Sequence, residues 1–351
     1  MTDNPYSNLP SSAFWKTGVA EENPYLIKNI YQKKFRIPPK AKIVTAGSCF
    51  AQHITRHLRR NGFNLLDVEP PPPGLPEKLH QRYGFSMYSA RYGNIYTVRQ
   101  LLQLAQEASG EWRPESFIWQ RNGRYFDALR PNVEPNGLDS SDEVIEHRQY
   151  HLQKVKEAFE QLDVFIFTLG LTEMWIHSAS GTVFPTAPGT LAGDFDETTY
   201  AFKNAQFRDI LQDFNQFQKT LKQLRGGKSF KTILTVSPVP LTATASGRHV
   251  LVSTSESKSI LRAVAGQLCQ KSKRIDYFPS YEIATNPRLH ATAFTSNLRS
   301  IRDETVDIVM RHFFSEHTPS KAKNPSLTPE DKHLARDMIQ CEEAIMEMFA
   351  Q

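Results

Sequence analysis

The sequence predicts an α/β fold with a parallel sheet, and three strand-like runs carry that prediction. They span 43–46, 163–170 and 232–238, and each is short and rich in apolar residues. Such runs are typical of strands that helices cover on both faces. Segments of helical periodicity separate the three runs, as the crossover connections between parallel strands require.

In chain order, residues 1–40 are rich in Pro, Asn and aromatic residues and predict an irregular arm that ends at Pro38-Pro39. The α/β domain is expected at 41–315. Four prolines and a glycine at 70–74 exclude a helix or a central strand there. Residues 316–351 predict a linker and a peripheral C-terminal helix that begins at 328–331 with an N-cap and a proline.

The other elements follow from apolar spacing, capping residues and glycines. A loop is expected at the aromatic stretch 83–98, where it either packs on the sheet or faces the substrate. A hairpin or loop is expected at 110–137, and a loop at 178–195. Helices are expected at 98–108, 141–161, 199–225, 257–269 and 303–314, and a fourth short strand at 275–278.

Composition excludes several classes of protein. The 351 residues are 39% hydrophobic and 23% charged, with a net charge of +5 and no long Lys/Arg run, so nucleic acid is not an expected partner. The N-terminus has no apolar core, and no segment is long and apolar enough to span a membrane. The cysteines Cys49, Cys269 and Cys341 form no CxxC pair and no disulfide framework. We expect a cytoplasmic, reduced protein without metal or cofactor; its oligomeric state stays open.

The stretch from Gly47 to Cys49 is the first candidate site. A buried strand ends at Gly47, a tight turn carries the Ser48 hydroxyl and the Cys49 thiol, and a helix with apolar residues at 50, 54 and 58 follows. Ligands of open α/β sheets bind where strands end in this way. The positive end of a helix dipole also stabilises a thiolate or an oxyanion. A cysteine at such a joint can equally serve packing alone.

Polar residues follow the other predicted strands at the same edge of the sheet. Because the carboxyl ends of parallel strands share one edge, we expect a single crevice there. Its members are Ser48, Cys49, Thr172, Glu173, Tyr281, Glu282 and the loop 239–254 that holds His249.

Six motifs distributed along the chain resemble those of the GSCFA family. They are Gly-Ser-Cys-Phe-Ala at 47–51, Tyr-Gly-Asn-Ile-Tyr-Thr at 92–97, Thr-Leu-Gly-Leu-Thr-Glu at 168–173, Ser-Pro-Val-Pro at 237–240, Ser-Lys at 257–258 and Tyr-Phe-Pro-Ser-Tyr-Glu at 277–282. The resemblance covers most of residues 4–315, and the family is itself similar to the SGNH/GDSL hydrolases. It implies a flavodoxin-like three-layer α/β/α sandwich and ester hydrolysis or acyl transfer, often on acylated sugars.

The resemblance also implies roles for individual residues. SGNH enzymes carry a nucleophilic serine two residues after a glycine, where this chain has Cys49, so either Cys49 or Ser48 is the implied nucleophile. Gly93 matches the glycine whose amide donates to the oxyanion, and it is followed by Asn94. The Gly-x-Asn motif matches Gly170-Leu171-Thr172, with a threonine hydroxyl in place of the amide. Gly47, Gly93, Asn94, Gly170 and Thr172 are therefore expected to bind substrate or oxyanion.

The Asp-x-x-His motif that supplies the base in SGNH enzymes has no counterpart, since residues 297–300 read Asn-Leu-Arg-Ser. A cysteine depends less on a base than a serine does. His249 is the preferred substitute base, with His290 as the other choice, and Glu173 is expected to orient the imidazole or to form a salt bridge.

Three functions stay open at this point. The first is an acyl ester hydrolase or O-acyltransferase acting on an acylated sugar or polysaccharide. The second is an SGNH-like module that binds a glycan or other small ester without turnover, which the missing Asp-x-x-His favours. The third is a scaffold that binds a partner through its aromatic arm and C-terminal helix.

Overall fold

The computed structural model describes residues 4–317 and 342–350. Its centre is a parallel sheet of four strands in the order β1 (Ile43–Gly47), β4 (Val164–Leu169), β8 (Lys231–Val236) and β9 (Ile275–Tyr277). An isolated parallel bridge joins Ile43 to Leu65 on the outer side of β1. The register places Gly47 opposite Thr168, so β1 and β4 end side by side. The predicted α/β class and parallel sheet are confirmed.

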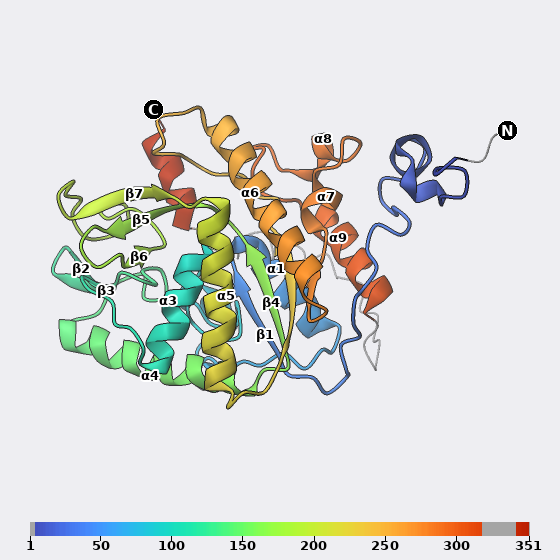
Figure 1. The fold of residues 1–351 in the computed structure, drawn as a ribbon. Coiled ribbons are helices and arrows are strands. Elements are labelled where there is room, and N and C mark those ends of the chain that lie inside the picture. The colour runs from blue at the N-terminus through green and yellow to red at the C-terminus, as the bar shows by residue number, and fades with distance from the viewer. Residues whose placement is uncertain (1–3, 318–341, 351) are drawn as a thin grey trace.

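Helices cover both faces of the sheet (Figure 1), an arrangement consistent with a three-layer sandwich. The α-helices are α1 (Cys49–Arg60), α2 (Glu77–His80), α3 (Val98–Ser109), α4 (Ser141–Gln161), α5 (Phe207–Leu224), α6 (Val250–Lys271), α7 (Ser280–Ala284), α8 (His290–Ala293) and α9 (Asp303–Glu316). Alternate strand residues separate the two layers of the core. Val44 and Phe165 pack with α3, α4, α5 and α6, whereas Ile43 and Val164 pack with α1, α7 and α9.

Two small antiparallel units project beside the main sheet. β2 (Ile118–Arg121) and β3 (Arg124–Asp127) form the hairpin predicted within 110–137. A second sheet has the order β6 (Val183–Phe184), β5 (Glu173–His177) and β7 (Tyr200–Asn204). Because β5 starts four residues after β4 ends, this second sheet begins at the carboxyl edge of the main one.

Two predicted helix boundaries are wrong. The helix expected at 199–225 begins at Phe207, because residues 200–204 pair with β5 as a strand. The helix expected at 257–269 begins at Val250, whose neighbours Leu251 and Val252 are exposed. Exposed apolar side chains in its first turn break the helical spacing, so periodicity could not reveal it.

Short helices occupy both ends of the chain. The arm contains η1 (Ser11–Ala13) and η2 (Lys16–Ala20), η3 (Gln81–Tyr83) follows α2, and η4 (Glu342–Phe349) lies at the C-terminus. The arm leads away from the α/β body on the side of α8 and α9, whereas η4 lies near β5 and β7 (Figure 1). The helix start expected at 328–331 lies outside the described residues, and the boundaries at 40 and 315 stay predictions. Within 4–317 and 342–350, no helix is long and apolar enough to cross a membrane.

Candidate active site

Three segments meet at the carboxyl edge of the sheet: the end of β1, residues 93–97 and the exit of β4. The Ile95 amide donates to the Gly47 carbonyl at 2.9 Å, which holds the second segment against the first. The amides of Gly170 and Leu171 donate to the Tyr96 carbonyl at 3.2 and 2.9 Å, which joins the third segment to the second. Segments far apart in the sequence thus form one hydrogen-bonded unit.

Two glycines let these segments approach closely. A β-carbon on Gly47 would stand 2.6 Å from the Thr168 carbonyl oxygen, and its φ of +143° is one that side chains disfavour. A β-carbon on Gly170 would stand 2.9 Å from the β-carbon of Ser48. Both predicted glycines therefore lie at the joint, although the Gly170 amide faces Tyr96 rather than the Ser48 side chain.

Ser48 is the N-cap residue of α1, but its side chain does not cap the helix. It is 3% exposed, and Oγ has no hydrogen-bond partner in the described part of the chain. The N-cap residues of α3 and α4 behave differently, since Thr97 accepts from the Gln100 amide and Ser140 from the Glu143 amide, both at 3.2 Å. A buried hydroxyl without a partner is costly, so one left at a helix start indicates use by a ligand or water.

Cys49 is the first residue of α1 and is 6% exposed. Its position places this residue at the positive end of the helix dipole. The second described cysteine, Cys269, lies near the end of α6, where burial raises its pKa to about 11. Neither forms a disulfide.

Thr172 presents a second unpartnered hydroxyl at this edge. Its side chain is fully buried, and Oγ1 has no partner within the described residues. Its amide donates to Ser257 Oγ at 3.1 Å, and the next residue of α6, Lys258, donates from Nζ to the Gly170 carbonyl at 2.8 Å. Lys258 is 1% exposed, so its amine is buried against the exit of β4.

Asn94 is buried and helps to hold the loop. Its Oδ1 accepts from Gln52 Nε2 at 3.1 Å and from the Tyr88 hydroxyl, and its carbonyl accepts from Gln100 Nε2 at 2.9 Å. Gly93 precedes it with a φ of +67°, which turns the chain toward β1. The predicted Gly93 and Asn94 therefore lie at the site.

His249 does not join this cluster. It is the N-cap of α6, is exposed, and accepts the Leu251 amide at Nδ1; within the described ranges it forms no hydrogen bond with Ser48 or Cys49. His290 begins α8 and is also exposed.

The predicted acidic residues separate as well. Glu173 accepts from the Thr244 hydroxyl at 2.8 Å, and burial raises its pKa. Glu282 lies elsewhere, bound to Arg262 and to the Tyr277 hydroxyl. Of the two glutamates expected at one crevice, Glu173 therefore lies beside the loop after β8, whereas Glu282 is engaged at the start of α7.

Sequence reasoning missed two residues near the nucleophile. His53 lies one helical turn after Cys49, a spacing that the sequence already shows. Burial, with Arg56 and His57 nearby, lowers its pKa well below the usual value, and its Nδ1 is 2.8 Å from Arg56 Nη2. Lys258 was expected in the Ser-Lys motif and as a possible salt-bridge partner of Glu173, but not as the donor to the Gly170 carbonyl that the structure shows.

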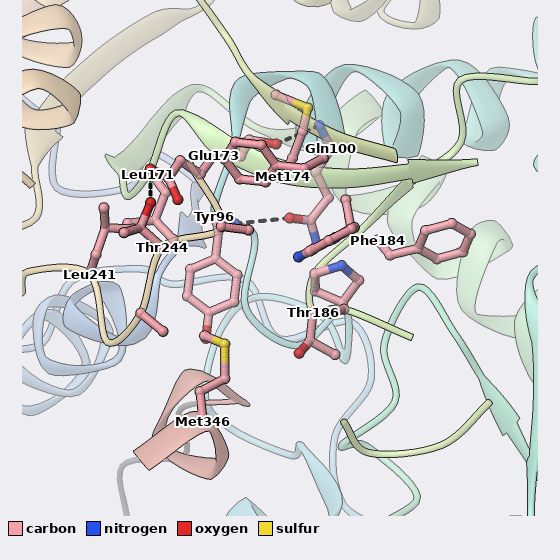
Figure 2. A pocket seen from close by; sticks show the side chains of 17 residues that line it. Tyr96, Gln100, Leu171, Glu173, Met174, Phe184, Thr186, Leu241, Thr244 and Met346 are labelled. Atoms are coloured by element: carbon pink, nitrogen blue, oxygen red, sulfur yellow. Dashed lines mark hydrogen bonds between the residues drawn. The ribbon is translucent and has the colours of Figure 1, made fainter. Parts of the chain in front are cut away.

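A cavity of about 190 Å³ opens beside the joint. Tyr96 and Leu171, whose backbones are hydrogen-bonded to each other, form its inner wall, and Glu173 and Thr244 meet at another wall (Figure 2). Ser48 and Cys49 lie behind the inner wall and are not among the described residues that line the cavity. No group of three or more His, Cys, Asp or Glu side chains placed to hold a metal ion occurs in residues 4–317 and 342–350.

Comparison with models of protein families identifies the family of this chain. No curated protein matches the chain. The model of the GSCFA family matches residues 42–313, which include the sheet, both helical layers and every segment of the joint. The chain therefore belongs to the GSCFA family.

Proposed function

We propose that this protein is an acyl ester hydrolase or O-acyltransferase that acts on an acylated sugar or polysaccharide through Cys49 or Ser48. The observation that carries the proposal is the Ser48 hydroxyl, which occupies an N-cap position yet does not cap α1 and has no partner among the described residues. The adjacent thiol begins the same helix. Two candidate nucleophiles therefore share the positive end of a helix dipole.

The chemistry follows from this placement. The nucleophile adds to the acyl carbonyl, and the negative charge that develops on the carbonyl oxygen is stabilised by first-turn amides of α1 and by the Thr172 hydroxyl. The alcohol leaves with a proton, and an acyl-enzyme remains. Water or a second hydroxyl then attacks the acyl-enzyme and regenerates the nucleophile. Water gives hydrolysis, and a sugar hydroxyl gives transfer.

We also propose that the fold is of the SGNH type. In a flavodoxin-like sheet the second strand lies on the outer side of the first, and the bridge between Ile43 and Leu65 occupies that position here. The order of the other strands, β1-β4-β8-β9, also agrees with a flavodoxin-like sheet. The candidate nucleophiles follow the first strand, as they do in SGNH enzymes. These features support the placement together with the Gly170-Leu171-Thr172 segment.

The test is a panel of p-nitrophenyl acetate and butyrate with Cys49→Ala, Ser48→Ala and the double variant. A Cys341→Ser background removes the cysteine that lies outside the described residues, and Cys269→Ala is the matched cysteine control. We expect one single variant and the double variant to lose on the order of 10³-fold in kcat/KM, and the acyl-enzyme mass to disappear with them. Full activity in the double variant contradicts the proposal.

The base is tested separately, because the two candidate histidines sit in different environments. His53 is buried one turn from Cys49, whereas His249 is exposed at the start of α6. If His53 accepts the proton, His53→Gln lowers kcat and His249→Gln leaves it unchanged; the reverse result restores His249 as the base.

A glycan-binding module without turnover is the second candidate. It is favoured by the burial of Ser48 and Cys49 and by the position of His249. This function predicts saturable binding of an acylated sugar with no acyl release and no covalent adduct. Detection of an acyl-enzyme in the native protein excludes it.

A further inference from the structure

The cavity beside the joint has walls of two kinds. Most of its lining is aromatic or aliphatic, including Leu171, Met174, Trp175, Phe184 and Leu241. These side chains come from the exit of β4, the small sheet and the loop after β8. Such a lining suits an apolar group and offers few partners to a sugar ring.

The size of the cavity restricts what it can hold. Whole small-molecule ligands occupy pockets of ~300–1,000 Å³, whereas this one measures about 190 Å³. A short acyl chain fits, and an acylated sugar as a whole does not.

The cavity also has polar groups in its lining, which could bind the polar end of a ligand. Glu173 and Thr244 are hydrogen-bonded to each other at 2.8 Å, and burial raises the pKa of the Glu173 carboxyl. Gln100 also lines the cavity, but its side chain is already engaged. Its Oε1 accepts from the Tyr96 backbone amide, and its Nε2 donates to the Asn94 carbonyl. The Glu173 carboxyl and its Thr244 partner are therefore polar groups of the lining that a sugar hydroxyl could reach.

Met346 of η4 closes one side of the cavity. Its side chain is directed toward the Tyr96 ring and is part of the lining (Figure 2). Met348, two residues later on the same short helix, is 81% exposed. The C-terminal segment thus places one of these two methionines against the cavity and leaves the other in solvent.

We propose that this cavity is the subsite for the acyl chain of the substrate and that Met346 competes with the longer chains for it. The inference rests on the proposed function, because Tyr96 and Leu171, which line the cavity, are hydrogen-bonded to each other within the joint that carries Ser48 and Cys49. Chains of about four carbons fit with Met346 in place. Chains of about eight carbons exceed the volume and must displace it.

Binding of methyl, butyl and octyl β-D-glucoside by the full-length protein tests the proposal. These ethers cannot be hydrolysed, so calorimetry measures the subsite without any catalytic step. Each buried methylene strengthens binding about fourfold, so the three additional methylenes of butyl glucoside should make it bind on the order of 60-fold more tightly than methyl glucoside. Equal affinities for the three glucosides overturn the proposal.

Variants distinguish binding of the glucosides in the cavity from nonspecific binding elsewhere on the protein. Met346→Ala should strengthen octyl binding severalfold and leave butyl binding unchanged, and Met348→Ala should change neither. Ala243→Trp, at an exposed lining position, should weaken butyl and octyl binding, whereas Ala263→Trp on the exposed side of α6 should not. If neither Met346→Ala nor Ala243→Trp changes the affinity for octyl glucoside, the assignment of the cavity as the acyl subsite is contradicted.

The two proposals can fail independently. Chain-length-dependent binding without esterase activity would retain the subsite and remove the catalytic function. Esterase activity that depends on Cys49 or Ser48, together with equal binding of all glucosides, would retain the function and remove the subsite.

Discussion

Gly170 and Ser48 are in direct contact across the joint between β4 and α1, since a β-carbon on Gly170 would stand 2.9 Å from the β-carbon of Ser48. The same added atom would meet the Tyr96 carbonyl oxygen at 2.9 Å. Neither neighbour is the end of a flexible side chain. The absence of a side chain at 170 therefore sets the distance between the candidate nucleophile and the wall of the cavity.

Gly170→Ala should destabilise the protein by ~1–3 kcal/mol, because overpacking forces backbone to move. It should also lower activity by more than the loss of stability explains, since Ser48 shifts with the backbone. Urea unfolding and ester hydrolysis measure the two effects. Gly266→Ala is the control: it lies within α6, its nearest contact is the flexible Arg262 side chain at 3.1 Å, and it should be neutral or stabilising. Equal stability of the two variants would refute the steric explanation.

Thr172→Val should separate stability from function. Removing a buried hydroxyl that has no partner among the described residues should raise the free energy of unfolding by ~1 kcal/mol. If that hydroxyl stabilises the oxyanion, kcat falls in the same variant. Thr232→Val is the matched control, because its hydroxyl is equally buried and unpartnered within the described chain but lies at the opposite end of the sheet. The Thr232→Val variant should gain stability and keep full activity. Loss of activity in both variants would show that Thr172 has no specific role in catalysis.

Asp127→Asn should cost ~3–5 kcal/mol, because it leaves two buried guanidinium groups without their shared carboxylate. Asp127 accepts from Arg130 Nε at 2.7 Å and from Arg148 Nη1 at 3.0 Å, and both arginine side chains are at most 5% exposed. Urea unfolding measures the loss. Glu157→Gln breaks the exposed pair with Lys154 and should give no measurable change. A loss of similar size in both variants would argue against burial as the cause.

Stability should fall as the pH drops from 6.5 toward 4. Burial lowers the pKa of His57 to about 3 and that of His151 and His317 to about 4. In the unfolded chain these imidazoles take up protons below pH ~6.5, whereas in the folded protein they stay neutral until the pH reaches their lowered pKa values. Each site should therefore cost ~2–3 kcal/mol between pH 7 and 4.5, measured by urea unfolding. His317→Gln should reduce the slope, and a stability that stays level over this range would show that these histidines are not buried as described.

Local sequence predicted the parts of the site that lie next to a strand end. Gly47, Ser48 and Cys49 follow β1 directly, and Gly170 and Thr172 follow β4, so the parallel sheet alone brings them together. His249 was expected to join them because it follows β8. The structure instead uses it to cap α6, since its loop continues for some residues beyond the strand end and is not constrained by the sheet.

The sequence by itself determined the alternation of strands and helices, the parallel sheet and the glycine turn that starts α1, because each depends on apolar spacing over a few residues. The tertiary structure decided which hydroxyls lack partners, that Lys258 is buried against Gly170, and that β5, β7 and Met346 enclose a cavity. These features depend on contacts between residues far apart in the chain. No local periodicity encodes them, because their energies come from close packing and desolvation after the elements have docked.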